Sequence, residues 1–233
     1  MTVRFSVTCI FSWFAMQNKQ INQNKENEAE EFKTGTTTVG LTTEDGVILA
    51  ADRRASMGRL TSSKRAKKIY ELDDNIGLTI AGSVGDAQKI VRIMRSQLKL
   101  HKLETKELTV KGAATLLSNV LHGNKMMPFL NQFVLGGRDS EDNGMLYTLD
   151  PAGGLMKHDR YTTTGSGSQM AYGVFEDNYE EDMDHEEAKE LATRAVQAAM
   201  ERDTASGNGI MVAEITEEGF NVLEEKEVEK RLE

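Results

Sequence analysis

The stretch TGTTTVGLTTEDGVILAADRRAS, residues 34–56, contains the strongest structural signal in this chain. Two runs rich in β-branched and small apolar residues, 36–41 and 46–51, are separated by a short polar segment. This segment ends in Asp45-Gly46, a dipeptide typical of a tight turn between antiparallel strands. The stretch therefore predicts a β-hairpin, in which three threonines begin an edge strand.

The segment before this hairpin has a different composition. Residues 17–33 are rich in Gln, Asn, Lys and Glu, and Ile21 and Phe32 are their only large apolar residues. Such a segment buries too little apolar surface to offset the entropy lost on ordering, so we expect a flexible tail. The apolar run 7–15 is too short to span a bilayer and makes a poor signal peptide. A translation start at Met16 is an alternative that the sequence leaves open.

The remainder of the chain alternates between two hydrophobic periods, one typical of strands and one typical of helices. Strands are predicted at 69–72, 76–81, 129–136, 144–149, 209–215 and 220–222, and helices at 87–100, 109–121 and 186–202. Strands in runs and helices in a pair favour antiparallel sheets with separate helical layers over a doubly wound parallel sheet. The pattern thus predicts an α+β fold, but periodicity leaves the stacking of the layers open.

Composition excludes several classes of function. The chain has 233 residues, of which 39% are hydrophobic, enough for one domain with a sizeable core. A net charge of −9 argues against non-specific binding of nucleic acid. Cys9 is the only cysteine, which excludes an internal disulfide framework and fits a reducing compartment. The four histidines are widely spaced, so we expect neither a metal site nor a cofactor.

Five ordered blocks of the sequence carry a family resemblance. They are 35–40 together with 46–56, then 67–69, 79–86, 164–168 and 202–207. In this order and spacing they resemble the β subunits of archaeal-type proteasomes. The resemblance extends from residue 36 to the carboxyl end and leaves out residues 1–33. It implies a four-layer αββα sandwich, the fold of the N-terminal nucleophile hydrolases, and the activity of a threonine endopeptidase.

The chemistry of such an enzyme depends on a free amino terminus. A hydroxyl is a poor nucleophile unless a nearby base accepts its proton. A free α-amino group, with an ordinary pKa of roughly 7.7–8.0, can serve as that base. We therefore expect self-cleavage between Gly35 and Thr36, which removes a propeptide of residues 1–35 and leaves a catalytic domain of residues 36–233. A glycine at position 35 would allow the unusual turn that this cleavage needs.

The resemblance implies roles for polar residues around Thr36. Lys68 corresponds to a lysine near the nucleophile, where a cation favours the neutral amine and the developing alkoxide. Asp52 would lie opposite Lys68 and keep it charged. Gly82 matches the position whose backbone N–H donates to the oxyanion of the tetrahedral intermediate.

Two further groups of residues match family positions. Those that position the Thr36 amine and the catalytic water are Ser166, Asp203 and Ser206. Those that line the pocket for the residue before the scissile bond are Ala55, Ser56, Ile80 and Val84. Each residue alone has an ordinary structural explanation as a turn, cap or core residue. The pocket implies cleavage after large apolar residues.

The family also implies partners. These are other β subunits in a seven-membered ring, proteasome α subunits, an ATP-dependent unfoldase and unfolded protein substrates, in the cytoplasm and without nucleic acid or membrane. A non-catalytic ring subunit is one alternative, but it predicts the loss of a catalytic residue. Another N-terminal nucleophile amidase, or the related bacterial two-ring protease, is a second alternative, and the block at 202–207 favours the archaeal type. The Gly165-Ser166-Gly167 segment lacks the Lys-Ser/Thr ending of a phosphate-binding loop.

Overall fold

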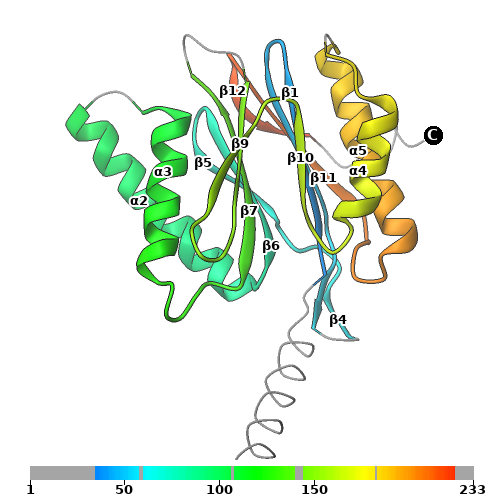
Figure 1. Ribbon diagram of the computed structural model, residues 1–233, viewed down its shortest axis with the longest axis horizontal. Helices are drawn as coiled ribbons and strands as arrows, with labels where there is room; N and C mark the ends of the chain where they lie inside the picture. The colour runs from blue at the N-terminus through cyan, green and yellow to red at the C-terminus, as the bar shows by residue number, and fades with distance from the viewer. Residues whose placement is uncertain (1–34, 58–59, 106–107, 140–143, 182, 224–233) are drawn as a thin grey trace, which may run out of the picture.

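Two antiparallel sheets stacked face to face form the centre of the molecule (Figure 1). The computed structural model describes residues 35–57, 60–105, 108–139, 144–181 and 183–223. The first sheet has the order β10-β1-β2-β11-β12 and the second has the order β5-β6-β7-β8-β9. One helix pair covers the outer face of each sheet (Figure 1). The described residues therefore form the four-layer αββα sandwich that the resemblance implied.

The strands of the two sheets and the four helices have the following bounds. The first sheet consists of β1 (Thr37–Thr43), β2 (Gly46–Asp52), β10 (Tyr161–Gly165), β11 (Ile210–Thr216) and β12 (Gly219–Val222). The second consists of β5 (Ile69–Asp73), β6 (Ile76–Gly82), β7 (Asn131–Arg138), β8 (Gly144–Leu149) and β9 (Leu155–His158). The helices are α2 (Val84–Thr105), α3 (Val110–Gly123), α4 (Ser168–Asn178) and α5 (His185–Arg202). A small hairpin of β3 (Ala55–Met57) and β4 (Leu60–Ser63) lies beside the sheets.

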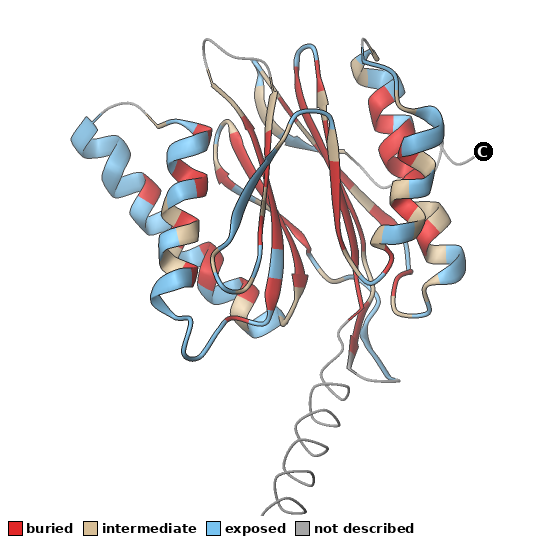
Figure 2. Cartoon of the chain, in the orientation of Figure 1, coloured by how far each residue is buried: buried red, intermediate tan, exposed pale blue. Residues whose placement is uncertain are grey.

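Strand β2 shows why the sheets stack. All of its residues are buried, and successive side chains point to opposite faces. Ile48 and Ala50 pack toward α4 and α5, while Val47, Leu49 and Ala51 pack against the other sheet. A third core lies between the second sheet and the pair α2 and α3. Figure 2 shows the buried residues gathered on these facing surfaces. A strand buried on both faces needs a continuous apolar run, which the sequence of β2 provides.

The sequence predictions hold for the hairpin and for the longest helices. Strands β1 and β2 pair as predicted, with Thr43 opposite Gly46 at the turn. The prediction that the first strand lies at a sheet edge is wrong, because β10 pairs with its other side. The predicted helix at 87–100 begins earlier, at Val84, where the Ser83 side chain accepts a hydrogen bond from the backbone N–H of Asp86. The predicted tail before residue 35 lies outside the described residues.

This topology gathers several chain segments at one end of the sandwich. Because neighbouring antiparallel strands run in opposite directions, the start of β1 lies beside the end of β2. The segments that meet there are the start of β1, the end of β2, the start of β5, the end of β6, the end of β10 and the loop after α5. In the part of the chain that the structure describes, no helix is long and apolar enough to cross a membrane.

Candidate active site

The three threonines that begin the first strand have different surroundings. Thr37 and Thr38 are completely buried, and their hydroxyls bond to Ser206 Oγ at 2.8 Å and Thr164 Oγ1 at 2.7 Å. Thr36, just before β1, instead lines a pocket, and its hydroxyl donates to the carbonyl oxygen of Gly35 at 2.7 Å. Thr36 is also buried, with 3% of its surface exposed, but among these three threonines it is the one that lines this pocket.

Asp52, the last residue of β2, accepts hydrogen bonds from several chain segments that surround Thr36. It has no exposed surface, and each of its carboxylate oxygens accepts two hydrogen bonds. Oδ1 accepts from Thr37 N at 2.9 Å and from Lys68 Nζ at 2.7 Å. Oδ2 accepts from Arg54 N at 3.0 Å and from Gly207 N at 2.9 Å. These four donors satisfy the hydrogen-bonding needs of a carboxylate that is out of reach of water.

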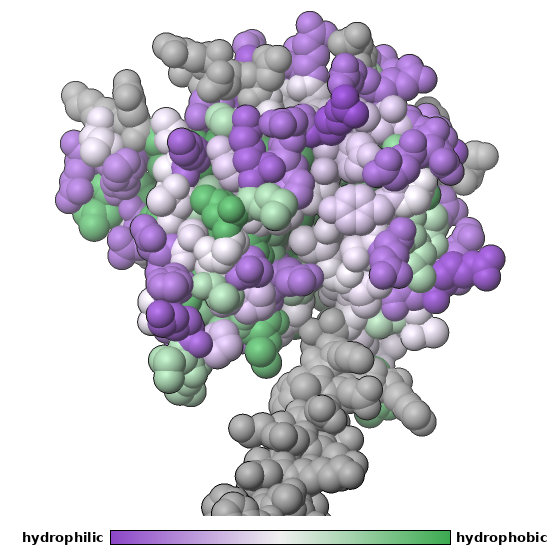
Figure 3. Space-filling model, in the orientation of Figure 1, coloured by the Kyte–Doolittle hydropathy of each residue, from purple (hydrophilic) through white to green (hydrophobic). Residues whose placement is uncertain are grey.

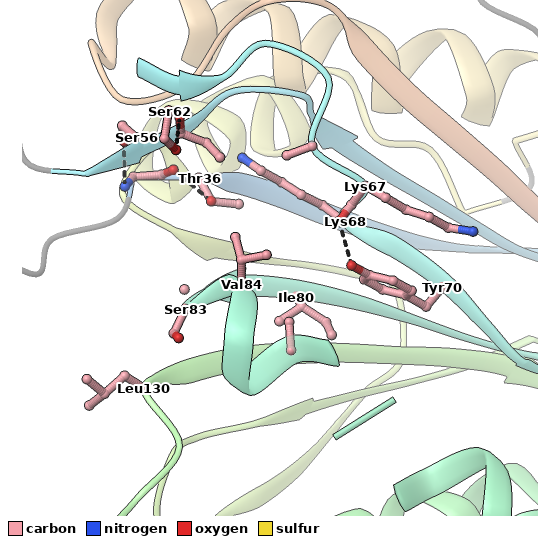
Figure 4. A pocket seen from close by; sticks show the side chains of 15 residues that line it. Thr36, Ser56, Ser62, Lys67, Lys68, Tyr70, Ile80, Ser83, Val84 and Leu130 are labelled. Atoms are coloured by element: carbon pink, nitrogen blue, oxygen red, sulfur yellow. Dashed lines mark hydrogen bonds between the residues drawn. The ribbon is translucent and has the colours of Figure 1, made fainter. Parts of the chain in front are cut away.

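Lys68 and Asp52 form the buried ion pair that the sequence analysis expected, with 2.7 Å between Nζ and Oδ1. Burial lowers the pKa of Lys68 from its ordinary value, and this effect outweighs Asp52 and Asp203, which raise it. Asp52 thus favours the charged lysine as expected, but the net direction is opposite. Figure 4 shows the Lys68 side chain extending toward Thr36, whereas Lys67 points the other way. Lys68 is therefore a cation whose proton is more easily lost than that of an exposed lysine.

A chain of hydroxyls and one carboxylate approaches Thr36 from the other side. Thr36 N donates to Ser166 Oγ at 3.2 Å, and Ser166 Oγ donates to Asp203 Oδ2 at 2.5 Å. The same Asp203 oxygen accepts from Ser206 Oγ at 2.7 Å. Ser206 continues to the Thr37 hydroxyl, so it supports the strand that holds Thr36. The three residues that were matched as positioning residues thus form one network next to the Thr36 nitrogen.

Gly82 ends β6 at the border of the same pocket. Its φ is +138°, a backbone conformation that other residues rarely adopt. A Cβ added to Gly82 would lie 2.1 Å from the carbonyl oxygen of Leu130. The structure therefore requires a glycine for reasons of conformation and space, in addition to the close substrate approach that was expected.

A Gly82→Ala substitution should destabilise the protein by about 1–3 kcal/mol, because it combines a strained φ with a backbone clash. Gly85 offers a matched control, since it lies in α2 and a Cβ there would meet nothing within 4 Å. Gly85→Ala should be neutral or stabilising by up to about 1 kcal/mol. Denaturant unfolding of both variants measures the difference. Equal stability of the two variants would contradict the steric requirement at position 82.

Comparison with known proteins identifies the family. Residues 32–215 match the family described as Proteasome subunit. The chain belongs to the proteasome subunit family. It is 54% identical over 199 residues to a protein of Methanocaldococcus fervens named Proteasome subunit beta, covering 85% of this chain and 89% of that one. Proteins with the same name from Methanothermobacter thermautotrophicus and Methanococcus maripaludis are 48% and 47% identical over 201 residues. These two alignments cover 85% and 86% of this chain and 95% and 92% of the relatives.

The proteasome-family fold brings all of the predicted site residues to one end of the sandwich. A pocket of about 340 Å³ is lined by Thr36, Lys68 and Gly82 and by the four residues predicted for substrate binding, which are Ala55, Ser56, Ile80 and Val84. Figure 4 shows Val84 and Ile80 on the side of this pocket opposite Thr36. The pocket surface is mostly apolar, and its polar lining includes Ser56, Ser83 and Lys68. Such a lining suits an apolar side chain next to a reacting backbone.

Sequence reasoning missed other residues that line this pocket, among them Tyr70 and Ala87. Two simple periodicities point to them. Tyr70 is two residues beyond Lys68 on an extended segment, so the two side chains share a face. Ala87 follows Val84 by about one helical turn in α2. The hydroxyl of Tyr70 donates to the carbonyl of Lys67 at 2.8 Å, which holds its ring at the pocket wall.

A second pocket, of about 550 Å³, lies on the other side of the Gly35–Thr36 segment. It is lined by Gly35, Gly82, Ser166 and Asp203 and by Ala205, which sequence reasoning also missed. Arg54 is another missed residue, and it fastens the loop after α5. Its Nη1 donates to Thr204 O at 2.6 Å and its Nε donates to Asn208 Oδ1 at 2.8 Å. No group of three or more His, Cys, Asp or Glu side chains within the described ranges is arranged to hold a metal ion.

Proposed function

We propose that this chain is a threonine-type endopeptidase, the β subunit of a proteasome core, made as a precursor from which self-cleavage removes residues 1–35. The observation that carries the proposal is the position of the Thr36 hydroxyl, whose oxygen lies 2.7 Å from the carbonyl oxygen of Gly35. The hydroxyl is thus directed at the peptide group to be cut. The relatives named Proteasome subunit beta support the same function.

Self-cleavage follows from this geometry as an acyl shift. Thr36 Oγ1 attacks the carbonyl carbon of Gly35, and its proton is passed through water to the Thr36 nitrogen that leaves. The bond between that carbon and Thr36 N then breaks, an ester forms at Oγ1, and the nitrogen, with this proton, becomes an amine. Ser166 Oγ, 3.2 Å from this nitrogen and bonded to Asp203, is within reach to take part in the proton transfer. Water hydrolyses the ester, which leaves a carboxylate on Gly35 and restores the hydroxyl of Thr36.

Hydrolysis of a peptide substrate uses the same groups. The new amine of Thr36 accepts the proton of its own hydroxyl as Oγ1 attacks the substrate carbonyl carbon. The charge of Lys68 stabilises the developing alkoxide, and the backbone N–H of Gly82 donates to the oxyanion. Collapse of the intermediate transfers the acyl group to Oγ1 and releases the substrate amine, which takes the proton. Water then hydrolyses the acyl-enzyme.

The substrate preference that we propose is for large apolar residues before the scissile bond. The walls formed by Ala55, Ile80 and Val84, with Tyr70 and Ala87 beyond them, present mainly carbon to the pocket. Burying an apolar side chain there contributes roughly 25 cal/mol for each Å² removed from water. A carboxylate side chain placed against these apolar walls would lose hydration there. The cations in the lining are Lys67 and Lys68, of which Lys68 is paired with Asp52.

Assembly with other proteasome subunits completes the proposal. The partners are other β subunits in a seven-membered ring, α subunits and an ATP-dependent unfoldase, within a cytoplasmic particle that degrades unfolded proteins. Exposed apolar side chains offer surface for subunit contacts. Leu155 and Met156 are exposed on β9, and Figure 3 shows apolar side chains in this part of an otherwise largely hydrophilic face. Met126 and Met127 are exposed in the loop after α3.

The proposal is tested by the intact mass and the peptidase activity of the protein assembled with its α subunits. We expect the mass of a chain that starts at Thr36, and hydrolysis of fluorogenic peptides with Leu or Tyr before the cut at least tenfold faster than of those with Glu. A chain that retains residues 1–35 and hydrolyses none of these peptides would favour a non-catalytic ring subunit. A preference for Glu would contradict the proposed pocket.

A further inference from the structure

Gly35 is held on several sides in the uncleaved chain. Its N–H donates to Ser56 Oγ at 3.4 Å, and its carbonyl oxygen accepts from the Thr36 hydroxyl at 2.7 Å. A Cβ added to Gly35 would lie 1.6 Å from Cβ of Ala205. The small side chain of Ala205 therefore occupies the space that any side chain at position 35 would need.

Ala205 cannot easily move away, because its loop is fastened at several points. Ala205 N donates to Asp203 Oδ1 at 3.1 Å, and Ser206 N donates to Asp203 O at 3.1 Å. On the other side of Ala205, the carbonyl of Thr204 accepts from Arg54 Nη1 at 2.6 Å. Moving this loop would also disturb the network of Asp203 beside the Thr36 nitrogen. The space next to Gly35 is thus set by a rigid part of the site.

We propose that Ala205 is a positioning residue for self-cleavage, and that its methyl group limits the residue before the scissile bond to glycine. This inference rests on the proposed function. Carbon atoms in good contact are about 3.5–4.0 Å apart, so a methyl group at position 35 would displace the peptide by an amount on the order of 2 Å. A displacement of about 1 Å from the reactive geometry can already reduce a rate about 100-fold. A side chain at position 35 is therefore excluded by the methyl group of Ala205, independently of any backbone turn that favours glycine there.

A double substitution tests this steric account. Gly35→Ala should slow self-cleavage about 100-fold, as followed by intact mass after synthesis. Adding Ala205→Gly removes the obstructing methyl group. The double variant should therefore cleave itself at least tenfold faster than Gly35→Ala alone. The recovery should be incomplete, because Cα and the carbonyl carbon of residue 205 remain at 2.8 Å and 3.1 Å from the added Cβ.

A second pair of variants separates a specific effect from general loosening of the loop. Ser166→Ala should also slow self-cleavage, because it removes the hydroxyl 3.2 Å from Thr36 N. Ala205→Gly should not restore the rate of this variant. The inference is overturned if Gly35→Ala stays equally slow with Ala205→Gly, or if Ala205→Gly restores Ser166→Ala to the same extent. An uncleaved wild-type chain would instead contradict the proposed function itself.

Discussion

Thr36→Ala should abolish both self-cleavage and peptide hydrolysis, and the assembled variant should keep the mass of the full 233-residue chain. The reason is that the substitution removes Oγ1, the atom that forms the new bond in both reactions, and the hydroxyls of the next two threonines are engaged elsewhere. Those of Thr37 and Thr38 are buried and bonded to Ser206 and Thr164. Peptide hydrolysis should fall by at least about 10⁴-fold, the scale of loss when a nucleophile is removed.

Two variants control for effects on folding. Thr36→Ser retains a hydroxyl and should still cleave itself and hydrolyse peptides, although more slowly. Thr38→Val keeps the shape of a buried β-strand residue whose hydroxyl bonds to that of Thr164. This variant should retain most of the activity at a cost of about 1 kcal/mol in stability. Equal activity of Thr36→Ala and the wild type would rule out the mechanism.

Lys68→Met should reduce kcat for peptide hydrolysis by about 10³-fold with little change in KM, since the lysine acts on charge that develops in the transition state. The pH profile gives a second readout. The charged lysine exists below its pKa, and burial lowers that pKa from its ordinary value. Wild-type activity should therefore decline on the alkaline side at a lower pH than an exposed lysine would give. The residual activity of Lys68→Met should lack this alkaline decline.

Lys64→Met provides the matched control, because Lys64 lies four residues before Lys68 in the sequence and is exposed. It should retain wild-type kcat and the wild-type pH profile. The variant Lys68→Met also leaves Asp52 buried without its ion-pair partner, so its unfolding free energy should drop by about 3–5 kcal/mol. Kinetics are therefore compared at a temperature where both variants are folded. An alkaline decline that persists in Lys68→Met would assign that limb to another group.

Much of the fold was predictable because its main elements carry strong local patterns. The hairpin of β1 and β2 has a turn dipeptide between apolar runs, and α5 has a broad buried stripe. The sequence did not reveal β10 and α4, since a short threonine-rich strand that leads into Gly165-Ser166-Gly167 resembles a loop. Without β10, the first strand was assigned to the edge of a sheet. Pairing between β1 and a strand so distant along the chain leaves no local signal.

The candidate site likewise combines residues that the sequence predicts with contacts that depend on the folded structure. Thr36, Asp52 and Lys68 were predictable because they lie in ordered blocks that resemble a family, and the structure brings them together. The contact between Gly35 and Ala205 was not, because it depends on how the loop after α5 folds back onto the start of β1. The net pKa direction of Lys68 was not predictable either. It depends on the balance between burial and the charge of Asp52, and burial is a property of the folded chain.

The four hydrogen bonds to Asp52 have a consequence for the timing of activation during synthesis. One donor, Gly207 N, comes from a segment that is made long after Thr36, and Asp203 and Ser206 belong to the same segment. A nascent chain that is still missing this segment has Thr36 but neither the complete Asp52 site nor the network beside the Thr36 nitrogen. A ribosome-bound fragment ending before residue 203 should therefore remain uncut. The protease would then be unable to activate itself before residues 203–207 have been made and have folded onto the start of β1.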